Sequence, residues 1–291
     1  MDWLTETKIP IGPWSRAFVE WLTAHGGWAF DAASLGLGRA IDGILWCLQS
    51  PPPLVAIAVF SVFVWWYRRS IGVTVFTVLG LLVILNQGYW KETTETLALV
   101  LASTAVCMLI GMPIGIAAAR RQWIYAALRP VLDLMQTIPT FVYLIPALIL
   151  FGLGMVPGLI ATVIFAVPAP IRLTRLGIVS TPEPLKEAAV AFGATPWQVL
   201  RKVELPYAMP QIMAGLTQTI MLSLSMVVIA ALVGANGLGV PVVRALNTVN
   251  IARGFEAGLC IVILAIILDR MLRVPGQAPP KRTLSFWKDR L

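Results

Sequence analysis

The 291-residue sequence has few charged residues and few of the side chains that usually bind metals or act as catalytic bases. Charged residues make up 12% of the chain, whereas about 25% is usual in soluble domains. There is one histidine, His25, and the three cysteines lie far apart at positions 47, 107 and 260 without any CxxC spacing. We therefore expect no disulfide framework, no metal site and no cofactor.

Motifs of nucleotide hydrolysis and of common membrane-embedded enzymes are also missing. No G-x-x-x-x-G-K-[ST] segment occurs, and no lysine directly follows a glycine. The chain therefore lacks a phosphate-binding P-loop, and without HExxH or G-x-S-x-G it offers little support for an enzyme. The net charge of +8 is not gathered into a basic patch with aromatic residues, so we expect no nucleic-acid partner.

Long apolar stretches, in contrast, are abundant, because hydrophobic residues reach 58% and mean hydropathy is +0.82. A chain in hydrocarbon must satisfy its own backbone hydrogen bonds, so each stretch is predicted to be a helix. The sequence thus predicts an all-α polytopic membrane protein with about seven transmembrane helices, and a short outer helix over 240–250. The predicted spans are 53–67, 71–89, 96–119, 134–152, 155–171, 212–233 and 256–272.

The basic residues predict the orientation of these spans. Seven spans place 68–70, 120–133, 172–211 and the tail from 270 on one side of the membrane. Lysine and arginine are enriched in cytoplasmic loops, so this side is predicted to be cytoplasmic, with the N-terminus periplasmic and the C-terminus cytoplasmic. The 16 basic residues on this side, of 22 in the chain, are Arg68, Arg69, Arg120, Arg121, Arg129, Arg172, Arg175, Lys186, Arg201, Lys202, Arg270, Arg273, Lys281, Arg282, Lys288 and Arg290.

The N-terminal segment 1–52 is rich in tryptophan and too polar to span a membrane. One face of a predicted helix repeats apolar residues at helical spacing, from Leu37 through Ile41 to Leu48. Such a segment suits the membrane interface, but packing against the other spans is an equal alternative. The segment ends at three consecutive prolines, 51–53, which break a helix. Its tryptophans are Trp3, Trp14, Trp21, Trp28 and Trp46.

A polar segment between two apolar blocks has a specific spacing. Glu187-Ala188-Ala189 is followed after three residues by Gly193, and after nine more by Val203, with Leu205-Pro206 next. This resembles the EAA loop of ABC importer permeases, in which Ile usually stands where Val203 stands here. The resemblance implies that Glu187, Ala188, Ala189, Gly193, Val203, Leu205 and Pro206 couple the chain to a separate cytoplasmic ATP-binding subunit.

Local signals predict that this loop folds as two short helices around a glycine. Pro182 and Glu183 suit a helix start, and Gly193 suits a C-terminal stop after Phe192. Thr195-Pro196 predicts an N-cap and a first helical position. The second helix would present Val199, Leu200 and Val203 on one face and end at Leu205-Pro206. An elbow with a partly apolar face suits docking into a partner groove; the alternative is a solvated connector.

Other positions suggest a pathway or close helix packing. The start of the fourth span is interrupted by polar residues and prolines, namely Gln136, Pro139, Tyr143 and Pro146. This pattern indicates either a pore-lining or gating helix, or a kinked helix that serves packing. Gly111 and Gly115 indicate close packing, and the polar residues of the sixth span are expected mainly to join helices. They are Thr217, Gln218, Thr219, Ser223 and Ser225.

Further blocks resemble permeases of glycine betaine/proline/choline ABC importers, and within that group choline permeases. They are residues 86–93, residues 133–139 with Tyr143, and residues 254–258. The resemblance implies an inner-membrane subunit with a type I importer (MetI-like) core over 93–272. It also implies a periplasmic substrate-binding protein and a second permease copy as partners.

The remaining boundaries and alternatives follow from this assignment. Residues 53–92 would form two additional N-terminal spans. The EAA loop would occupy 172–211, and a cytoplasmic tail would occupy 273–291. An amino-acid importer permease is the nearest alternative. An ion-coupled secondary transporter has less support, because no unpaired ionisable residue is predicted at mid-membrane.

Overall fold

The computed structural model describes residues 10–272, which are almost entirely helical and contain no strand. The proposed cytoplasmic tail 273–291 and Trp3 lie outside the described residues. The helices that precede the elbow are α2 (Ile11–Gln49), α3 (Pro53–Arg68), α4 (Ile71–Asn86), α5 (Trp90–Arg120), α6 (Gln122–Thr137), α7 (Thr140–Phe151), α8 (Met155–Ala166) and α9 (Pro168–Val179). Then come α10 (Glu183–Ala191), α11 (Pro196–Val199), the π-helical turn η1 (Leu200–Glu204), α12 (Leu205–Ala231), α13 (Gly239–Asn247) and α14 (Ile251–Leu272).

Each predicted span overlaps a helix, although not all of these helices are long enough to cross a membrane alone. Within the described residues, four helical stretches have the required length and apolarity: 90–120, 155–179, 196–231 and 251–272. The number rises to six if each of two bent pairs, α2 with α3 and α6 with α7, is counted as one span. The 16 residues of α4 span only about 24 Å, less than the hydrocarbon core of about 30 Å. The short helix predicted over 240–250 is confirmed as α13, and its placement on the outer side stays a prediction.

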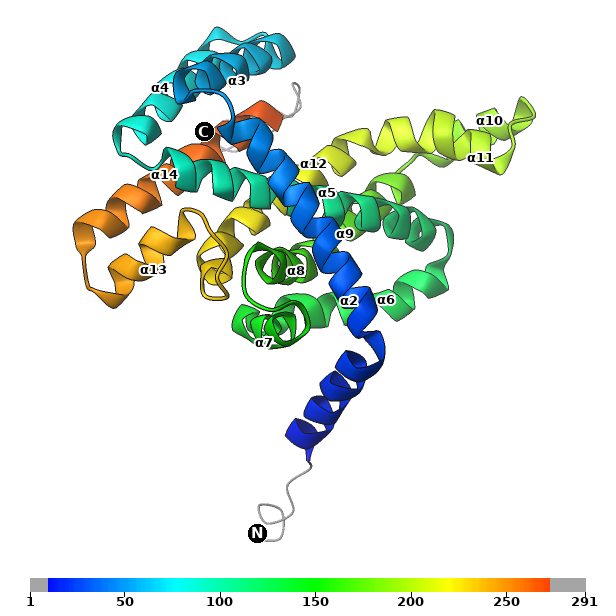
Figure 1. Ribbon diagram of the computed structural model, residues 1–291. Helices are drawn as coiled ribbons and strands as arrows, with labels where there is room; N and C mark the ends of the chain where they lie inside the picture. Colours follow the sequence, from blue (N-terminus) through cyan, green and yellow to red (C-terminus); the bar gives the residue numbers. More distant parts are fainter. Residues whose placement is uncertain (1–9, 273–291) are drawn as a thin grey trace, which may run out of the picture.

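The centre of the bundle is built by α5, α9 and α12, which pack on one another (Figure 1). A Cβ atom added to Gly111 would lie 2.7 Å from the Pro170 side chain, and one added to Gly115 would lie 2.7 Å from the Ile171 carbonyl oxygen. The close helix packing predicted for both glycines is thus confirmed. Ser103 Oγ on α5 donates a 3.1 Å hydrogen bond to Ser223 Oγ on α12, which confirms the helix-joining role predicted for Ser223. The hydroxyls of Thr217, Thr219 and Ser225 instead donate to carbonyls of α12 itself.

The N-terminal segment forms one long helix that packs on the bundle in its second half. Ile41 is 1% exposed and belongs to the same apolar core as residues of α5 and α8. Leu37, Ile44, Leu45 and Leu48 pack against this core, and Figure 1 shows α2 crossing beside α5. The packing alternative therefore describes this half of the helix. Four tryptophans, Trp14, Trp21, Trp28 and Trp46, remain exposed.

The fourth span was predicted as one helix over 134–152, which is wrong. Two helices, α6 and α7, replace it and meet at an angle of 98°. Pro139 lacks an N–H group and disfavours helical dihedrals in the residue before it. Ile138 accordingly has ψ 131° and ends α6.

The loop 172–211 is shorter and more helical than predicted. α9 continues to Val179, and the helix that starts at Pro196 continues to Ala231. Leu205-Pro206 was predicted to end the second loop helix, which is also wrong. Pro206 cannot donate a hydrogen bond and its ring crowds the carbonyl four residues earlier; the preceding turn η1 widens instead, and Leu205 N–H donates to the Leu200 carbonyl. Bulges of this kind let a helix continue past such a disruption.

Candidate functional site

The elbow between α10 and α11 lies at one end of the molecule, away from α13 (Figure 1). α10 ends in a Schellman motif, in which Ala194 N–H donates to the Ala189 carbonyl at 3.0 Å and Gly193 N–H donates to the Val190 carbonyl at 2.8 Å. Gly193 has φ +79°, a left-handed conformation that glycine adopts without cost. The predicted stop at Gly193 is confirmed.

The second helix of the elbow begins with a capping box. The Gln198 N–H donates to Thr195 Oγ1 at 3.4 Å, while Thr195 N–H donates to Gln198 Oε1 at 2.8 Å. Pro196 occupies the first turn, where a missing N–H has no effect on helix bonding. The N-cap predicted from Thr195-Pro196 is confirmed, and the reciprocal cap fixes the angle at which the chain enters the long helix 196–231.

The exposed apolar surface of the elbow differs from the predicted one. Val199 and Leu200 are buried, and Leu200 packs with Ile178, Ala208 and Ile212 of α9 and α12. The face predicted for a partner therefore anchors the elbow to its own bundle, because α9 extends far enough to cover it. The outward apolar residues are instead Leu185, Val190, Phe192 and Trp197.

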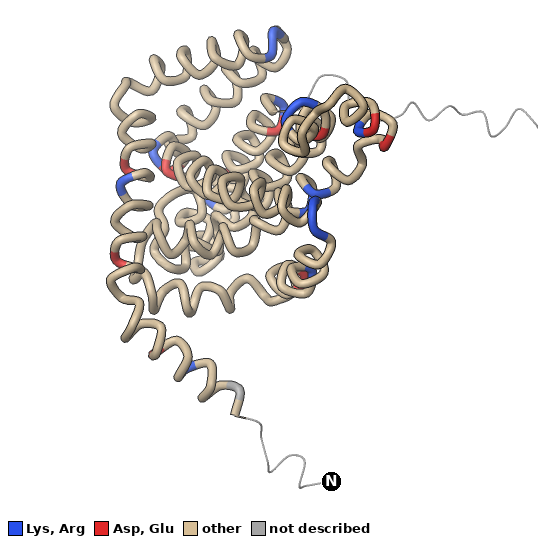
Figure 2. The backbone as a smooth tube through the Cα atoms, turned by 90° about the vertical axis from the view of Figure 1, so that its right-hand side faces the viewer, with Lys and Arg blue, Asp and Glu red and all other residues tan. Residues whose placement is uncertain are grey.

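The sequence-predicted coupling residues are distributed along this elbow. Glu187 and Ala188 are exposed and Ala189 is half-buried on α10, Gly193 forms the bend, and Val203 is half-buried within η1. Leu205 packs against the core at the start of α12, and Pro206 lies beside it. Figure 2, which views the elbow end, shows charged residues gathered around it and few along the bundle helices. The set forms one continuous structure, with its first half accessible and its second half held by the bundle.

Arg120 at the C-terminal end of α5 holds the elbow in place, a role that the sequence analysis missed. Its guanidinium Nη2 donates to the Pro196 carbonyl at 2.7 Å and lies 3.5 Å from Glu204 Oε2. The Glu204 side chain is 14% exposed, so water screens the pair only in part. The position of Arg120 at the end of a long span is a weak signal, because arginine there is common for orientation alone.

Replacing Arg120 by glutamine is expected to loosen the elbow without unfolding the bundle. A hydrogen bond to a charged group contributes about 1.5–3 kcal/mol, so amide exchange over 196–204 should become at least about tenfold faster. Hydrogen exchange with mass spectrometry measures this. Arg121→Gln is the matched control, because Arg121 makes no polar side-chain contact within residues 10–272; equal exchange in both variants would remove the anchoring role.

Three of the four pathway candidates, Gln136, Pro139 and Tyr143, lie near the bend between α6 and α7. Gln136 Oε1 accepts a 3.0 Å hydrogen bond from Arg172 of α9, which also donates to Asp133 Oδ1 at 2.6 Å. Tyr143 is 8% exposed, and its hydroxyl donates to the Met135 carbonyl at 2.6 Å. Pro139 immediately precedes α7, and Pro146 lies within it. These contacts explain how the bend is held, and the role of the four residues in a pore or gate stays a prediction.

At the opposite end of α5 the structure forms a polar cavity of about 380 Å³. The Leu238 N–H donates to Thr96 Oγ1 at 2.8 Å, which brings the loop after α12 against the start of α5. Charged residues from two distant segments of the sequence line the cavity. They are Lys91, Glu92, Glu95, Arg244 and Arg253.

The sequence analysis missed this cavity. Glu95 was placed just outside the third span, but α5 begins at Trp90 and Glu95 is 8% exposed within it. The sequence signal that could have indicated this cavity is the helical spacing of Glu92 and Glu95 beside Lys91. Nearby, burial and the Glu256 carboxylate raise the pKa of Tyr89, whose hydroxyl donates to Glu256 Oε2 at 3.4 Å.

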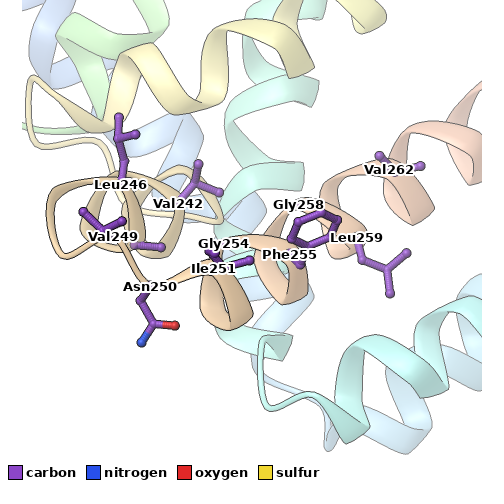
Figure 3. Close-up of a pocket in the computed structure, with 11 residues that line it drawn as sticks. Val242, Leu246, Val249, Asn250, Ile251, Gly254, Phe255, Gly258, Leu259 and Val262 are labelled. Atoms are coloured by element: carbon purple, nitrogen blue, oxygen red, sulfur yellow. The ribbon is translucent and has the colours of Figure 1, made fainter.

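A second hollow, between α13 and α14, is apolar. It measures about 750 Å³, and Figure 3 shows its side chains, among them Val242, Leu246, Phe255 and Val262. Apolar helix surfaces that face lipid are normal in a membrane protein. This groove therefore does not indicate a ligand.

The long helices, the capped elbow and its spacing define the permease subunit of an ABC importer. The chain belongs to the family described as binding-protein-dependent transport system inner membrane component, whose profile matches residues 111–276. The family description implies an ATP-binding subunit and a substrate-binding protein as partners. The relatives are transport permeases, and the predicted type I importer fold is confirmed.

Among its relatives, the chain is 46% identical over 264 residues to the glycine betaine transport system permease protein OpuAB of Bacillus subtilis, covering 91% of this chain and 93% of that protein. It is 42% identical to the glycine betaine/proline betaine transport system permease protein ProW of Escherichia coli, covering 99% of this chain and 81% of that protein. A chain of the MetNI methionine ABC transporter, solved in inward-facing conformations, matches with TM-score 0.57 and 25% identity, over 63% of this chain and 94% of that chain.

Proposed function

We propose that this chain is the permease subunit of an ATP-driven importer for glycine betaine and related quaternary ammonium compounds, choline among them. Relatives at 42–46% identity over at least nine-tenths of the chain are named for glycine betaine, with proline betaine or carnitine in two of the names. Choline was predicted from sequence resemblance and stays a prediction. The subunit is non-catalytic in this proposal, and ATP hydrolysis belongs to its partner.

The observation that carries the coupling role is the continuous helical connection between the elbow and the bundle. The exposed apolar residues of the elbow offer a docking surface, and the helix 196–231 runs from it without a break. Arg120 ties the elbow to α5 as well. At 1.5 Å per residue, the 31 residues of α5 extend about 46 Å, which is enough to carry a movement across a bilayer.

The proposed mechanism is alternating access with two permease copies. Closure of the ATP-binding subunits would draw the two elbows together, and the long helices would transmit that displacement to the outer end. Basic-residue asymmetry supports a cytoplasmic elbow, a periplasmic N-terminus and a cytoplasmic C-terminus. In this orientation the polar cavity opens on the periplasmic side.

Uptake measurements with the complete transporter test this proposal. Deleting the chain should reduce uptake of labelled glycine betaine to background, and unlabelled choline should compete if it shares the pathway. Substituting the P-loop lysine of the ATP-binding subunit should also abolish uptake, because that lysine contacts the nucleotide phosphates. Unchanged uptake after deletion would refute the substrate, and uptake that survives the lysine substitution would favour a secondary transporter.

An amino-acid importer is the second candidate, because a chain of the MetNI methionine ABC transporter shares the fold. Its 25% identity over 63% of the chain is much lower than the identity to the glycine betaine permeases. Uptake of labelled methionine in the same vesicles, without uptake of glycine betaine, would favour this candidate instead.

A further inference from the structure

The polar cavity at the outer end of α5 separates charges of opposite sign. Its inner part contains Glu95, which is 8% exposed, and half-buried Glu92. Its exposed part contains three cationic residues, Lys91, Arg244 and Arg253. The cavity therefore has an acidic floor and a basic rim.

The acidic floor lacks partners within the protein. No hydrogen bond or ion pair to the Glu95 side chain occurs within residues 10–272, although the charges of Lys91 and Glu92 act on it from beyond ion-pair distance. Glu92 Oε2 is fully buried without a hydrogen-bond donor. Buried carboxylates without partners are costly, so a group that supplies positive charge here would be favoured.

The volume and the lining residues define the class of that group. At about 380 Å³, the cavity is at the small end of the roughly 300–1,000 Å³ that ligand sites occupy. A methylated ammonium group has no N–H to donate, so it needs only negative charge and aromatic surface. Glu95, Glu92 and Tyr89 offer these. A ligand carboxylate would pair with the guanidinium groups of Arg244 and Arg253, which donate in a planar fork.

We propose that this cavity is a binding site for a small zwitterion that carries a quaternary ammonium group and a carboxylate, with the ammonium group at Glu95 and the carboxylate at the two arginines. The inference rests on the proposed function and adds a site within the permease, separate from the substrate-binding protein. It also predicts how two substrates are distinguished: choline has the ammonium group but no carboxylate, so it would use the floor and not the rim.

Ligand-detected NMR on the permease and ATP-binding subunits in lipid nanodiscs, without the substrate-binding protein, tests the site. Saturation transfer to the methyl protons of glycine betaine is expected with the wild type. Glu95→Gln should weaken the binding of both glycine betaine and choline at least about tenfold, as expected for loss of a charged partner. Combined Arg244→Gln and Arg253→Gln should weaken glycine betaine by a similar factor and leave choline within about twofold.

Matched variants separate the site from general effects of charge. Glu20→Gln and Arg39→Gln remove exposed charges on α2 and should leave binding unchanged. Correct folding is checked by ATP hydrolysis stimulated by the loaded substrate-binding protein, which should persist in Glu95→Gln.

Three results would overturn the site. Wild-type permease that transports glycine betaine but gives no saturation transfer would refute it, while the proposed function stands. Equal losses for choline and glycine betaine in the arginine variant would refute the assignment of the two ends. If the same arginine variant loses stimulated ATP hydrolysis but binds both ligands normally, the two arginines contact the substrate-binding protein and not the ligand. Absence of glycine betaine uptake in the wild type would refute the proposed function itself. The NMR binding measurement does not depend on uptake, so the two failures can be distinguished.

Discussion

Replacing Phe192 and Trp197 together by serine is expected to release the ATP-binding subunit and abolish ATP-driven uptake. Phe192 is 93% exposed and Trp197 65% exposed, so neither stabilises the permease by burial. Aromatic residues at the centre of an interface often contribute at least about 2 kcal/mol each, which corresponds to a loss of affinity of at least about 30-fold per residue. Co-purification of the two subunits and uptake in vesicles measure this loss.

The control for this variant is Trp28→Ser. Trp28 is 77% exposed on α2, far along the chain from the elbow, and its replacement should leave both co-purification and uptake intact. If the double variant retains its partner at wild-type levels, the elbow is a solvated connector, which was the alternative reading of its turn chemistry. If the double variant is not monodisperse when it is purified without the ATP-binding subunit, the two aromatic side chains instead stabilise the fold of the permease.

Replacing Gly115 by valine is expected to destabilise the centre of the bundle. Its Cβ atom would lie 2.7 Å from the Ile171 carbonyl oxygen and 2.8 Å from Thr174 Cβ. Both belong to α9, one of the main packing partners of α5, so the backbone of one helix must move. Overpacking of this kind typically costs about 1–3 kcal/mol. A lower melting temperature in detergent and a lower yield of the complex are the expected results.

Gly258→Val provides the comparison for that substitution. Gly258 also lies within a long apolar helix, α14, and a Cβ atom there would meet no atom within 4 Å. The intrinsic effect of glycine to valine on helix propensity is the same in both variants and is below about 1 kcal/mol. Similar melting temperatures for the two variants would contradict the packing role of Gly115.

Much of the elbow could be predicted because its signals are local. Gly193 and Thr195 act within a few residues of themselves, through a positive φ angle and a cap. The same locality limits the prediction at Leu205-Pro206. A proline usually ends a helix, but here burial of Leu200 and Ala208 against α9 keeps the chain helical. The only local effect of Pro206 is the π-helical turn before it.

The apolar stretches by themselves determined an all-helical membrane protein, because hydrocarbon permits few other backbone arrangements. The cap and stop signals at Pro182, Gly193 and Thr195-Pro196 determined a two-helix elbow. Tertiary structure alone decided which side of that elbow faces outward, because Val199 and Leu200 are buried and Leu200 packs against residues of α5 and α9. It alone also formed the charged cavity, since Glu95 and Arg244 are separated by nearly 150 positions. Periodicity reports what a helix buries, whereas the partner of each buried face follows from the packing of all helices together.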